Sequence, residues 1–376
     1  MRGLGILIVL LLTGCQGDQQ AQISDLSAEI PDKISHIWPV PAPLSQPDGL
    51  RPCCAFGYDL KAELLGVPVP FYHAENVIDA DQLGAHVYNN SELSGITNLM
   101  GMSSENLGLL YTRRAGFIDI AHIRDTADNT LFLFSQIWPR LGEEWQLELG
   151  TELASRRIQF RAFTPPKSEQ QRYILATFLA ARLAYQMAVW HEIAQWYGYQ
   201  SVFGFSEQVS AFSPEDLYSN MIGAKLSATL ILSGRATSLD QYNSSMMAAL
   251  PQVLHQLGAV NQTETRLQFD YVDGTWWDSK RYLPQKFLLL LRDYETGNAR
   301  KPMMVPGENM PTASLALPTR FADVRLADIA ELQMRPGKLM ENLPVPKSYY
   351  TAKDFSRLAQ YAERQDAKQL LQNKRN

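Results

Sequence analysis

Residues 165–198 read PPKSEQQRYILATFLAARLAYQMAVWHEIAQWYG, and this stretch decides the expected fold. After two prolines, Lys167 or Ser168 opens a helix that we expect to continue to Tyr197. Gly198 follows, and glycine is the residue that most often ends a helix in the left-handed conformation. This long, mostly apolar segment predicts the centre of a helical core.

One face of this helix is lined with small residues, because Ala180, Ala184 and Ala188 fall four apart. Another helix can therefore approach closely there. His191 and Gln195 continue the same face at helical-neighbour spacings. We expect His191 to point into the protein rather than toward solvent.

Three other segments carry helical signals. Residues 117–138 show an apolar helical pattern that stops before a proline. Ser213 followed by Pro214 predicts an N-cap and first helical position, with the helix continuing to about Leu232. Residues 353–372 predict a polar terminal helix.

Short strands are expected around these helices. Residues 108–113 are typical of a brief strand, and residues 266–272 alternate like a strand before a turn at 273–274. Residues 146–152 and 156–163 fit either two paired strands or a broken helix. The fold class predicted is mainly α with small β elements (α+β), with a central helical bundle-like core and a mixed C-terminal region. The expected helical main domain covers 46–260, and a strand and loop extension with the terminal helix covers 261–376.

The N-terminus predicts export and lipidation. A charged start is followed by an apolar run over residues 4–12, which is too short to cross a membrane. Leu12-Thr13-Gly14-Cys15 resembles the lipobox of bacterial lipoproteins. We therefore expect a signal peptide over 1–15, a lipid such as palmitate on Cys15, and a flexible tether over 16–45. Gln16 at the second mature position favours the outer membrane, facing the periplasm, with the body attached only by its lipid.

Composition excludes some partners and leaves the cysteines open. Hydrophobic residues make up 45% and charged residues 19%, with a net charge of −5, so no basic surface for nucleic acid is expected. Cys53 and Cys54 are adjacent. They are either buried thiols or a strained vicinal disulfide, which can act as a redox switch.

Four helical residues suggest a metal site. His191-Glu192 begins like the zincin motif, but position 195 is Gln, a poor zinc ligand. Asp119 and His122 lie three apart, a spacing that suits metal ligation inside helical bundles. With Glu215, they complete a ligand set for zinc or another divalent ion. In this hypothesis His122 and His191 are ligands, Asp119 or Glu215 is the carboxylate ligand, and Glu192 is the base that activates water.

Each candidate also has a purely structural interpretation. His191 fits a hydrogen-bonded core histidine, and Glu192 fits a partner for Arg182 or a neighbouring helix. His122 and Asp125 fit an ion-paired helix surface. Glu215 and Asp216 fit helix-start chemistry, in which a carboxylate caps the helix. Trp276 and Trp277 are weaker candidates, and packing is favoured for them over stacking on a sugar. His73 and His86 are also weaker candidates.

Several motifs together resemble a known group of proteins. These are PCCAFG at 52–57, GFIDIAHIRD at 116–125, WHEI at 190–193 and FSPEDLYSN at 212–220. They are similar to domain-of-unknown-function family 4056, a group of exported bacterial proteins, over about residues 50 to 300. The resemblance implies export and no particular mechanism.

Three functions remain open on this evidence. The leading hypothesis is a periplasm-facing metal-dependent hydrolase that uses the residues above. The second is a non-enzymatic envelope protein that binds a glycan or a protein partner. The third is a cysteine-dependent, peptidase-like enzyme, in which Cys53 or Cys54 pairs with His86 or His122.

Overall fold

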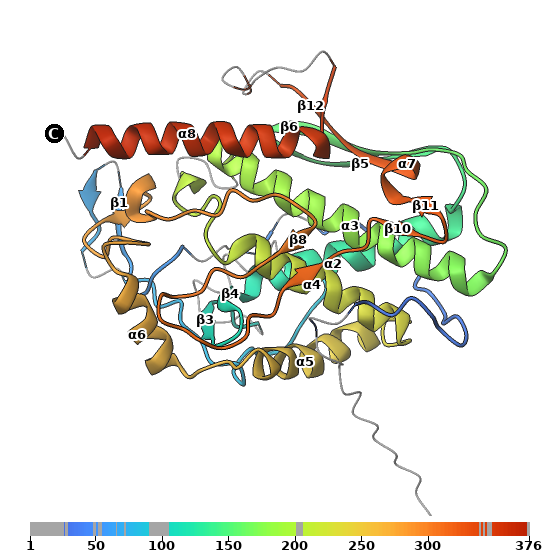
Figure 1. The fold of residues 1–376 in the computed structure, drawn as a ribbon, viewed down its shortest axis with the longest axis horizontal. Helices are drawn as coiled ribbons and strands as arrows, with labels where there is room; N and C mark the ends of the chain where they lie inside the picture. Colours follow the sequence, from blue (N-terminus) through green and yellow to red (C-terminus); the bar gives the residue numbers. More distant parts are fainter. Residues whose placement is uncertain are drawn as a thin grey trace, which may run out of the picture.

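The computed structural model describes residues 26, 29–47, 50–51, 55–64, 66–70, 73–89, 105–200, 206–337, 340, 343 and 348–373. The predicted signal peptide with Cys15 lies outside the described residues. So do Cys53 and Cys54. The fold that these residues form is mixed α+β, as predicted: helices build the centre and small sheets surround them (Figure 1).

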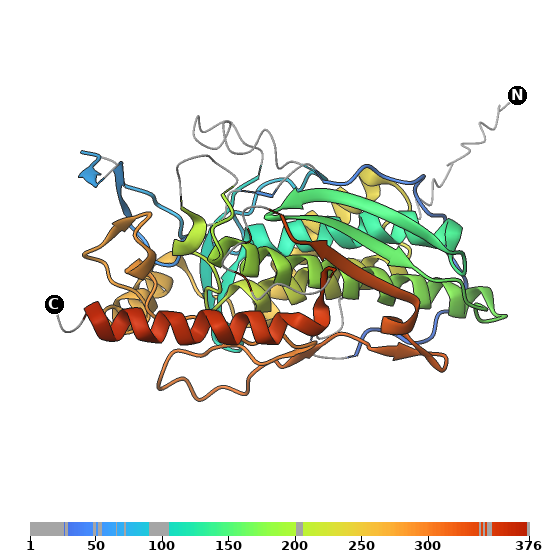
Figure 2. The same ribbon diagram turned by 90° about the horizontal axis from the view of Figure 1, so that it is seen from above.

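Three helices form the core of the molecule. They are α2 (Ile120–Ile137), α3 (Glu169–Trp196) and α4 (Asp216–Leu232), and α2 packs against both of the others. Figures 1 and 2 show the three helices side by side in the centre. Helices α3 and α4 are buried on nearly every face, which explains why their sequences lack a polar stripe.

Helix α3 confirms the sequence prediction almost to the residue. The Ser168 hydroxyl accepts from the amide of Gln171 as the N-cap, and Gly198 has a φ of +105° just beyond the end. By length and composition alone this helix could cross a membrane. However, 89% of its most apolar window is buried inside the protein, as in the core helix of a globular body.

The main sheet has four antiparallel strands in the order β13-β12-β6-β5. They are β5 (Trp145–Glu152), β6 (Ala154–Phe160), β12 (Ala330–Arg335) and β13 (Tyr350–Thr351). The predicted segments 146–152 and 156–163 are therefore paired strands rather than a broken helix, although the second strand ends at Phe160. Strand β12 joins them from the far end of the sequence, with Leu332 opposite Ile158.

Short elements complete the fold. Their bounds are β1 (Lys61–Leu64), β2 (Val67–Pro68), β3 (Leu109–Thr112), β4 (Gly116–Asp119), α5 (Leu239–Gln256), α6 (Gln262–Val272), β7 (Tyr282–Leu283), β8 (Ala299–Arg300), β9 (Leu315–Ala316), β10 (Arg320–Phe321), β11 (Val324–Arg325), α7 (Leu326–Ile329) and α8 (Phe355–Asn373). The terminal helix, α8, was expected from the sequence.

Three local predictions were wrong. Residues 266–272 belong to helix α6, because Asn261 caps it and the buried Thr265, Phe269 and Val272 fall at helical spacing. The helix expected from residue 117 starts only at Ile120, after strand β4. Ser213 does not cap α4, whose N-cap is Glu215.

Residues beyond 260 complete the core rather than forming a unit apart. Phe56 and Phe117 pack with Phe269 and Trp276 in one buried apolar cluster. Trp277 is 2% exposed in the same cluster, so both tryptophans have the packing role. Since β12 also pairs with β6, the helical and C-terminal regions share their cores.

The described part of the segment predicted as a tether lies against the folded body. Leu26 and Ile30 are buried, and the indole of Trp38 donates to the carbonyl of Leu232. Leu44 is held to α2 by hydrogen bonds of its backbone to Ser135 and Gln136. Over these residues the segment has fixed contacts with the helices.

Helices α2 and α4 cross at Gly223, and this contact generates a testable prediction. A Cβ at position 223 would lie 2.1 Å from the carbonyl oxygen of Ile123, which is backbone and cannot move aside cheaply. We expect Gly223→Ala to lower the free energy of unfolding by about 2 kcal/mol or more. Gly150→Ala is the control, since its nearest neighbour is a flexible arginine end at 3.7 Å. Chemical denaturation measures both, and equal stability of the two variants would contradict the close crossing.

Candidate metal centre and adjoining cavity

Asp119 stands where strand β4 becomes helix α2. Its Oδ1 accepts from the amides of Ala121 at 2.6 Å and His122 at 3.3 Å, so it is the N-cap of α2. Its own amide donates to the Ser219 hydroxyl on α4 at 2.9 Å. This cap fixes Asp119 and His122 relative to each other and ties both to α4.

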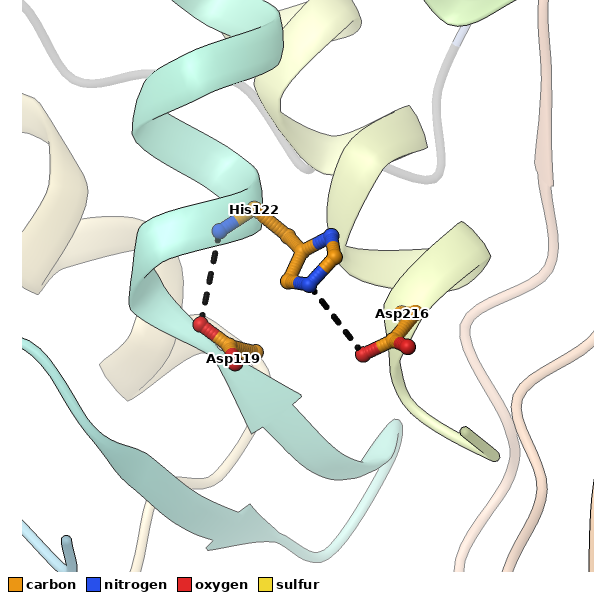
Figure 3. Close-up of side chains that lie close together, drawn as sticks. All are labelled: Asp119, His122 and Asp216. Atoms are coloured by element: carbon orange, nitrogen blue, oxygen red, sulfur yellow. Dashed lines mark hydrogen bonds and ion pairs between the residues drawn. The ribbon is translucent and has the colours of Figure 1, made fainter. Parts of the chain in front are cut away.

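Asp216 reaches the same point from the first turn of α4. Phe212 has a φ of +58°, and the turn that follows lets the Ser213 amide donate to Asp216 Oδ2 at 3.2 Å. The Ser213 hydroxyl donates to Glu215 Oε2 at 2.8 Å. Asp216 Oδ1 lies 3.4 Å from His122 Nε2 (Figure 3).

Asp119, His122 and Asp216 form a buried group that could hold a metal ion. One ligand atom from each lies within 4.8 Å of the others, and the exposed fractions are 0%, 7% and 0%. Among the residues that the structure describes, this is the one group of at least three such side chains. Two predicted ligands, Asp119 and His122, are therefore brought together, and Asp216 completes the group instead of Glu215 or His191.

The ring of His122 is oriented by its other nitrogen. Nδ1 lies 3.0 Å from the Asn220 amide nitrogen, and the Asn220 oxygen accepts from the Thr126 hydroxyl at 2.6 Å. Glu192 Oε1 lies 3.9 Å from the same Nδ1. Glu192 Oε2 accepts from the Phe212 amide at 2.8 Å, and this bond holds the carboxylate on the Nδ1 side of the His122 ring.

The surroundings of this group are acidic and buried. Burial, and then the Glu192 and Glu215 carboxylates, raise the pKa of Asp216 well above its ordinary value. Burial also raises the pKa of Glu215 to about 8, with Asp119 contributing. Burial lowers the pKa of His122 to about 4, so this ring is neutral near pH 7. Without a cation, the site keeps protons on its acids.

Three carboxylate oxygens here receive no hydrogen bond from a backbone amide or a neutral donor within the described chain: Glu192 Oε1, Glu215 Oε1 and Asp216 Oδ1. Glu192 and Asp216 share a hydrogen bond, which requires a proton on one of them. The buried Arg292 interacts electrostatically with both, but its ion pair is with Asp366. Several buried carboxylates that share so little positive charge are costly unless they are protonated or bind a metal. The donor set thus fits a divalent ion.

A cavity of about 300 Å³ adjoins the group. His122 and Asn220 line this cavity, whereas Asp119 and Asp216 do not line it. The other lining residues come from the segment before α2, from α2 itself, from the β5–β6 hairpin and from α3: Gln46, Pro47, Leu50, Arg51, Ala121, Asp125, Asn129, Gly150, Thr151, Glu152, Arg156, Met187, Ala188, His191 and Tyr199.

His191 faces this cavity beside a carboxylate. Its Nδ1 lies 3.7 Å from Glu152 Oε1, and Glu152 Oε2 pairs with Arg156 at 2.7 Å. Burial opposes the charged ring, but Glu152 outweighs it and raises the pKa of His191 above its ordinary value. His191 thus points inward as expected, and its partner is Glu152 rather than the metal-capable group.

A second charged cluster lies further along α2, and its charges are paired within the chain. Arg51 contacts Glu105 at 2.7 Å, Asp125 at 2.8 Å and Asp128 at 3.0 Å. His86 Nε2 lies 3.0 Å from Asp128 Oδ1. Burial would raise the pKa of Asp128, but Arg51 and His86 lower it to about 2. Asp125 is therefore ion-paired, but in a buried cluster rather than on the helix surface that the sequence interpretation expected.

The remaining sequence candidates are placed elsewhere. His73 pairs with Asp59 on the surface, and His86 belongs to the Arg51 cluster. The cysteine-dependent alternative rests on Cys53 and Cys54, which fall outside the described residues, so it stays a prediction.

Sequence reasoning missed Asn220, Glu152, Arg156, Tyr199 and Asn129. Asn220 carried a usable signal, because it stands one helical turn after Asp216 within the FSPEDLYSN motif. Glu152 and Arg156, in the β5–β6 hairpin, carried no such signal, because their approach to α3 depends on how the sheet packs.

The site lies within a stretch shared with other proteins. A family model described as a protein of unknown function (DUF4056) matches residues 41–306. That span contains the metal-capable group and every residue that lines the cavity. No curated protein and no solved structure matches this chain.

The His191–Glu152 pair generates a prediction about pH. A histidine with a raised pKa stabilises the fold fully below about pH 6.5, its ordinary value, and this contribution is lost as pH rises through the raised value. Glu152→Gln removes the carboxylate, so we expect the pKa of His191 to fall. NMR titration of the imidazole in both proteins measures the change.

The matched control is Asp81→Asn, which removes the partner of the exposed His255. This exposed acid lies outside the cavity wall, so we expect the His191 titration in Asp81→Asn to match that of the unaltered protein. An unchanged His191 titration in Glu152→Gln would show that the two groups do not interact.

Proposed function

We propose that this chain, which belongs to the DUF4056 family, is a metal-dependent hydrolase that acts on the periplasmic side of the cell envelope. One observation carries the proposal: His122 belongs both to the buried Asp119–His122–Asp216 group and to the wall of the cavity. A ligand in the cavity would therefore contact the residue that also holds the metal.

The donor set suits zinc, manganese or iron, because it combines an imidazole with carboxylates. Asp119, His122 and Asp216 would hold the ion, which in such sites acidifies a bound water. The protons that now neutralise the acids would leave when the ion binds, since ligands must be deprotonated. This exchange explains how so many acids can be buried together.

Glu192 has an orienting role in this proposal. When the Nε2 atom of a histidine binds a metal, its Nδ1 carries the proton and usually donates to a carboxylate or carbonyl. In the structure the Asn220 amide donates to Nδ1, so the ring proton stands on Nε2 beside Asp216. Metal binding at Nε2 would move that proton to Nδ1, and Glu192 Oε1, 3.9 Å from Nδ1, is the carboxylate placed to accept from it. Glu192 would then hold the ring rather than act on water directly. His191, on the cavity wall with Glu152, is the group placed to transfer protons to a ligand.

A second candidate is a non-enzymatic envelope protein that binds a ligand in the cavity. The observation in its favour is that Asp119 and Asp216 do not line the cavity. In that case a bound ion would tie the start of α2 to the start of α4 and add stability only. Both candidate functions include the bound metal. They differ in whether protein variants that lose the metal also lose catalysis.

The first prediction from this proposal concerns metal content. The mature protein, purified without chelator or histidine tag, is expected to contain one divalent ion per chain by elemental analysis. His122→Ala and Asp216→Asn each remove a ligand and should lose most of that ion. His255→Ala, which changes an exposed histidine away from the site, should keep it.

Normal metal content in both ligand variants would overturn the proposed site. Absence of metal from the unaltered protein, even after reloading, would discard the hydrolase proposal as well. Loss of metal without any change in hydrolysis of envelope substrates would favour the non-enzymatic candidate.

The second prediction concerns location. If Cys15 carries the lipid, cells fed labelled palmitate should label the protein and retain it in the membrane fraction. Cys15→Ser should abolish the label and release the protein, because one short apolar run cannot anchor it alone. Cys54→Ser is the matched control and should remain labelled. A labelled, membrane-bound Cys15→Ser protein would contradict lipidation at this residue.

A further inference from the structure

We propose that the cavity beside His122 binds one neutral sugar unit. This inference names the substrate class of the proposed site and takes its catalytic meaning from the proposed function. The binding itself depends only on the cavity wall. Size, charge and the arrangement of polar and apolar groups each point to the same class of ligand.

The size suits a ligand of about one ring. Small-molecule sites span roughly 300–1,000 Å³, and this cavity stands at the lower end with about 300 Å³. At about 30 Å³ of liquid volume per water, it holds roughly ten water molecules. A single six-membered sugar fits that space, whereas an extended peptide or a long acyl chain would enter it only in part.

Most charged groups on the wall are paired within the chain. Arg51 faces three acids, and Arg156 pairs with Glu152, which also lies beside His191. An ionised ligand would lose its hydration and would have to compete with these internal pairs for a counter-charge, which is unfavourable. The ligand favoured is therefore uncharged.

Neutral polar groups remain available around the cavity. Asn129 is 8% exposed, and its amide donates to the Asp125 carbonyl, so its Oδ1 has no partner in the described chain. Gln46 accepts from the Gly150 amide through Oε1 and keeps its amide group. The Tyr199 hydroxyl is a third such group, and burial raises its pKa to about 12, so it stays protonated.

Asn129 thus offers a hydrogen-bond acceptor, Gln46 offers a donor, and the Tyr199 hydroxyl can donate and accept. Sugar hydroxyls also donate and accept at each position, so they can satisfy all three at once. Leu50, Met187 and Ala188 supply apolar wall between them, which suits the C–H faces of a sugar ring. A zwitterionic or phosphate-bearing ligand would leave this pattern unmatched.

The test uses N-acetylglucosamine and glucose as probes with the mature protein. Saturation-transfer NMR should show binding of at least one of them and titrations should give its Kd. Tyr199→Phe and Asn129→Leu each remove one hydrogen bond to a neutral partner, so each should weaken binding about 3- to 10-fold. Tyr271→Phe, an exposed tyrosine on α6, is the matched control and should bind normally.

Absence of binding by both sugars would overturn the inference, as would equal affinity in Tyr199→Phe and the unaltered protein. Preferential binding of inorganic phosphate or of the dipeptide alanyl-alanine would also overturn it. Thermal unfolding checks that Asn129→Leu is folded, and Tyr199→Phe provides the result if it is not. Metal content is measured in parallel: metal without sugar binding rejects this inference alone, and sugar binding without metal rejects the hydrolase alone.

Discussion

The close crossing of α2 and α4 is the contact on which the rest of the structure depends. Gly223 has no side chain and lets α4 approach the backbone of Ile123. This brings the first turns of both helices together, so that Asp119 and His122 meet Asp216 (Figure 3). Asn220 contacts the same histidine ring. A larger residue at 223 would separate the same four side chains, because protein interiors are close-packed.

Two groups of buried acids lie along α2, and each is stabilised in a different way. Arg51 supplies the cation that Asp125, Asp128 and Glu105 require. At the start of the helix, Asp216 and Glu215 lie near the neutral His122, and burial raises the pKa values of both acids. Both arrangements satisfy the same electrostatic constraint. The first does so with an internal ion pair, whereas the second does so with protons that a divalent ion can replace.

The cavity is built from parts of the chain that are far apart in sequence. Gln46 and Arg51 come from the stretch just after the predicted tether, His191 from α3, and Glu152 from the sheet.

Local patterns in the sequence determined the helices with strong periodicity and clear ends. Ser168, Gly198 and the alanine spacing were enough for α3, and the spacing of Asp119 and His122 was enough to pair them. Alternation misled at 266–272, because apolar residues two apart do not exclude a helix whose buried positions are four apart. The sequence could therefore assign elements wherever one period dominated.

Tertiary structure alone decided which acid completes the site. Glu215 and Asp216 are adjacent, and a step of one residue turns a helical side chain by about 100°. The backbone at Phe212 and the bonds of Ser213 set that rotation and direct Asp216 toward His122. Likewise, Glu152 meets His191 only because the β5–β6 hairpin packs beside α3. These contacts depend on how whole helices and strands are placed relative to one another, and no local pattern in the sequence encodes that placement.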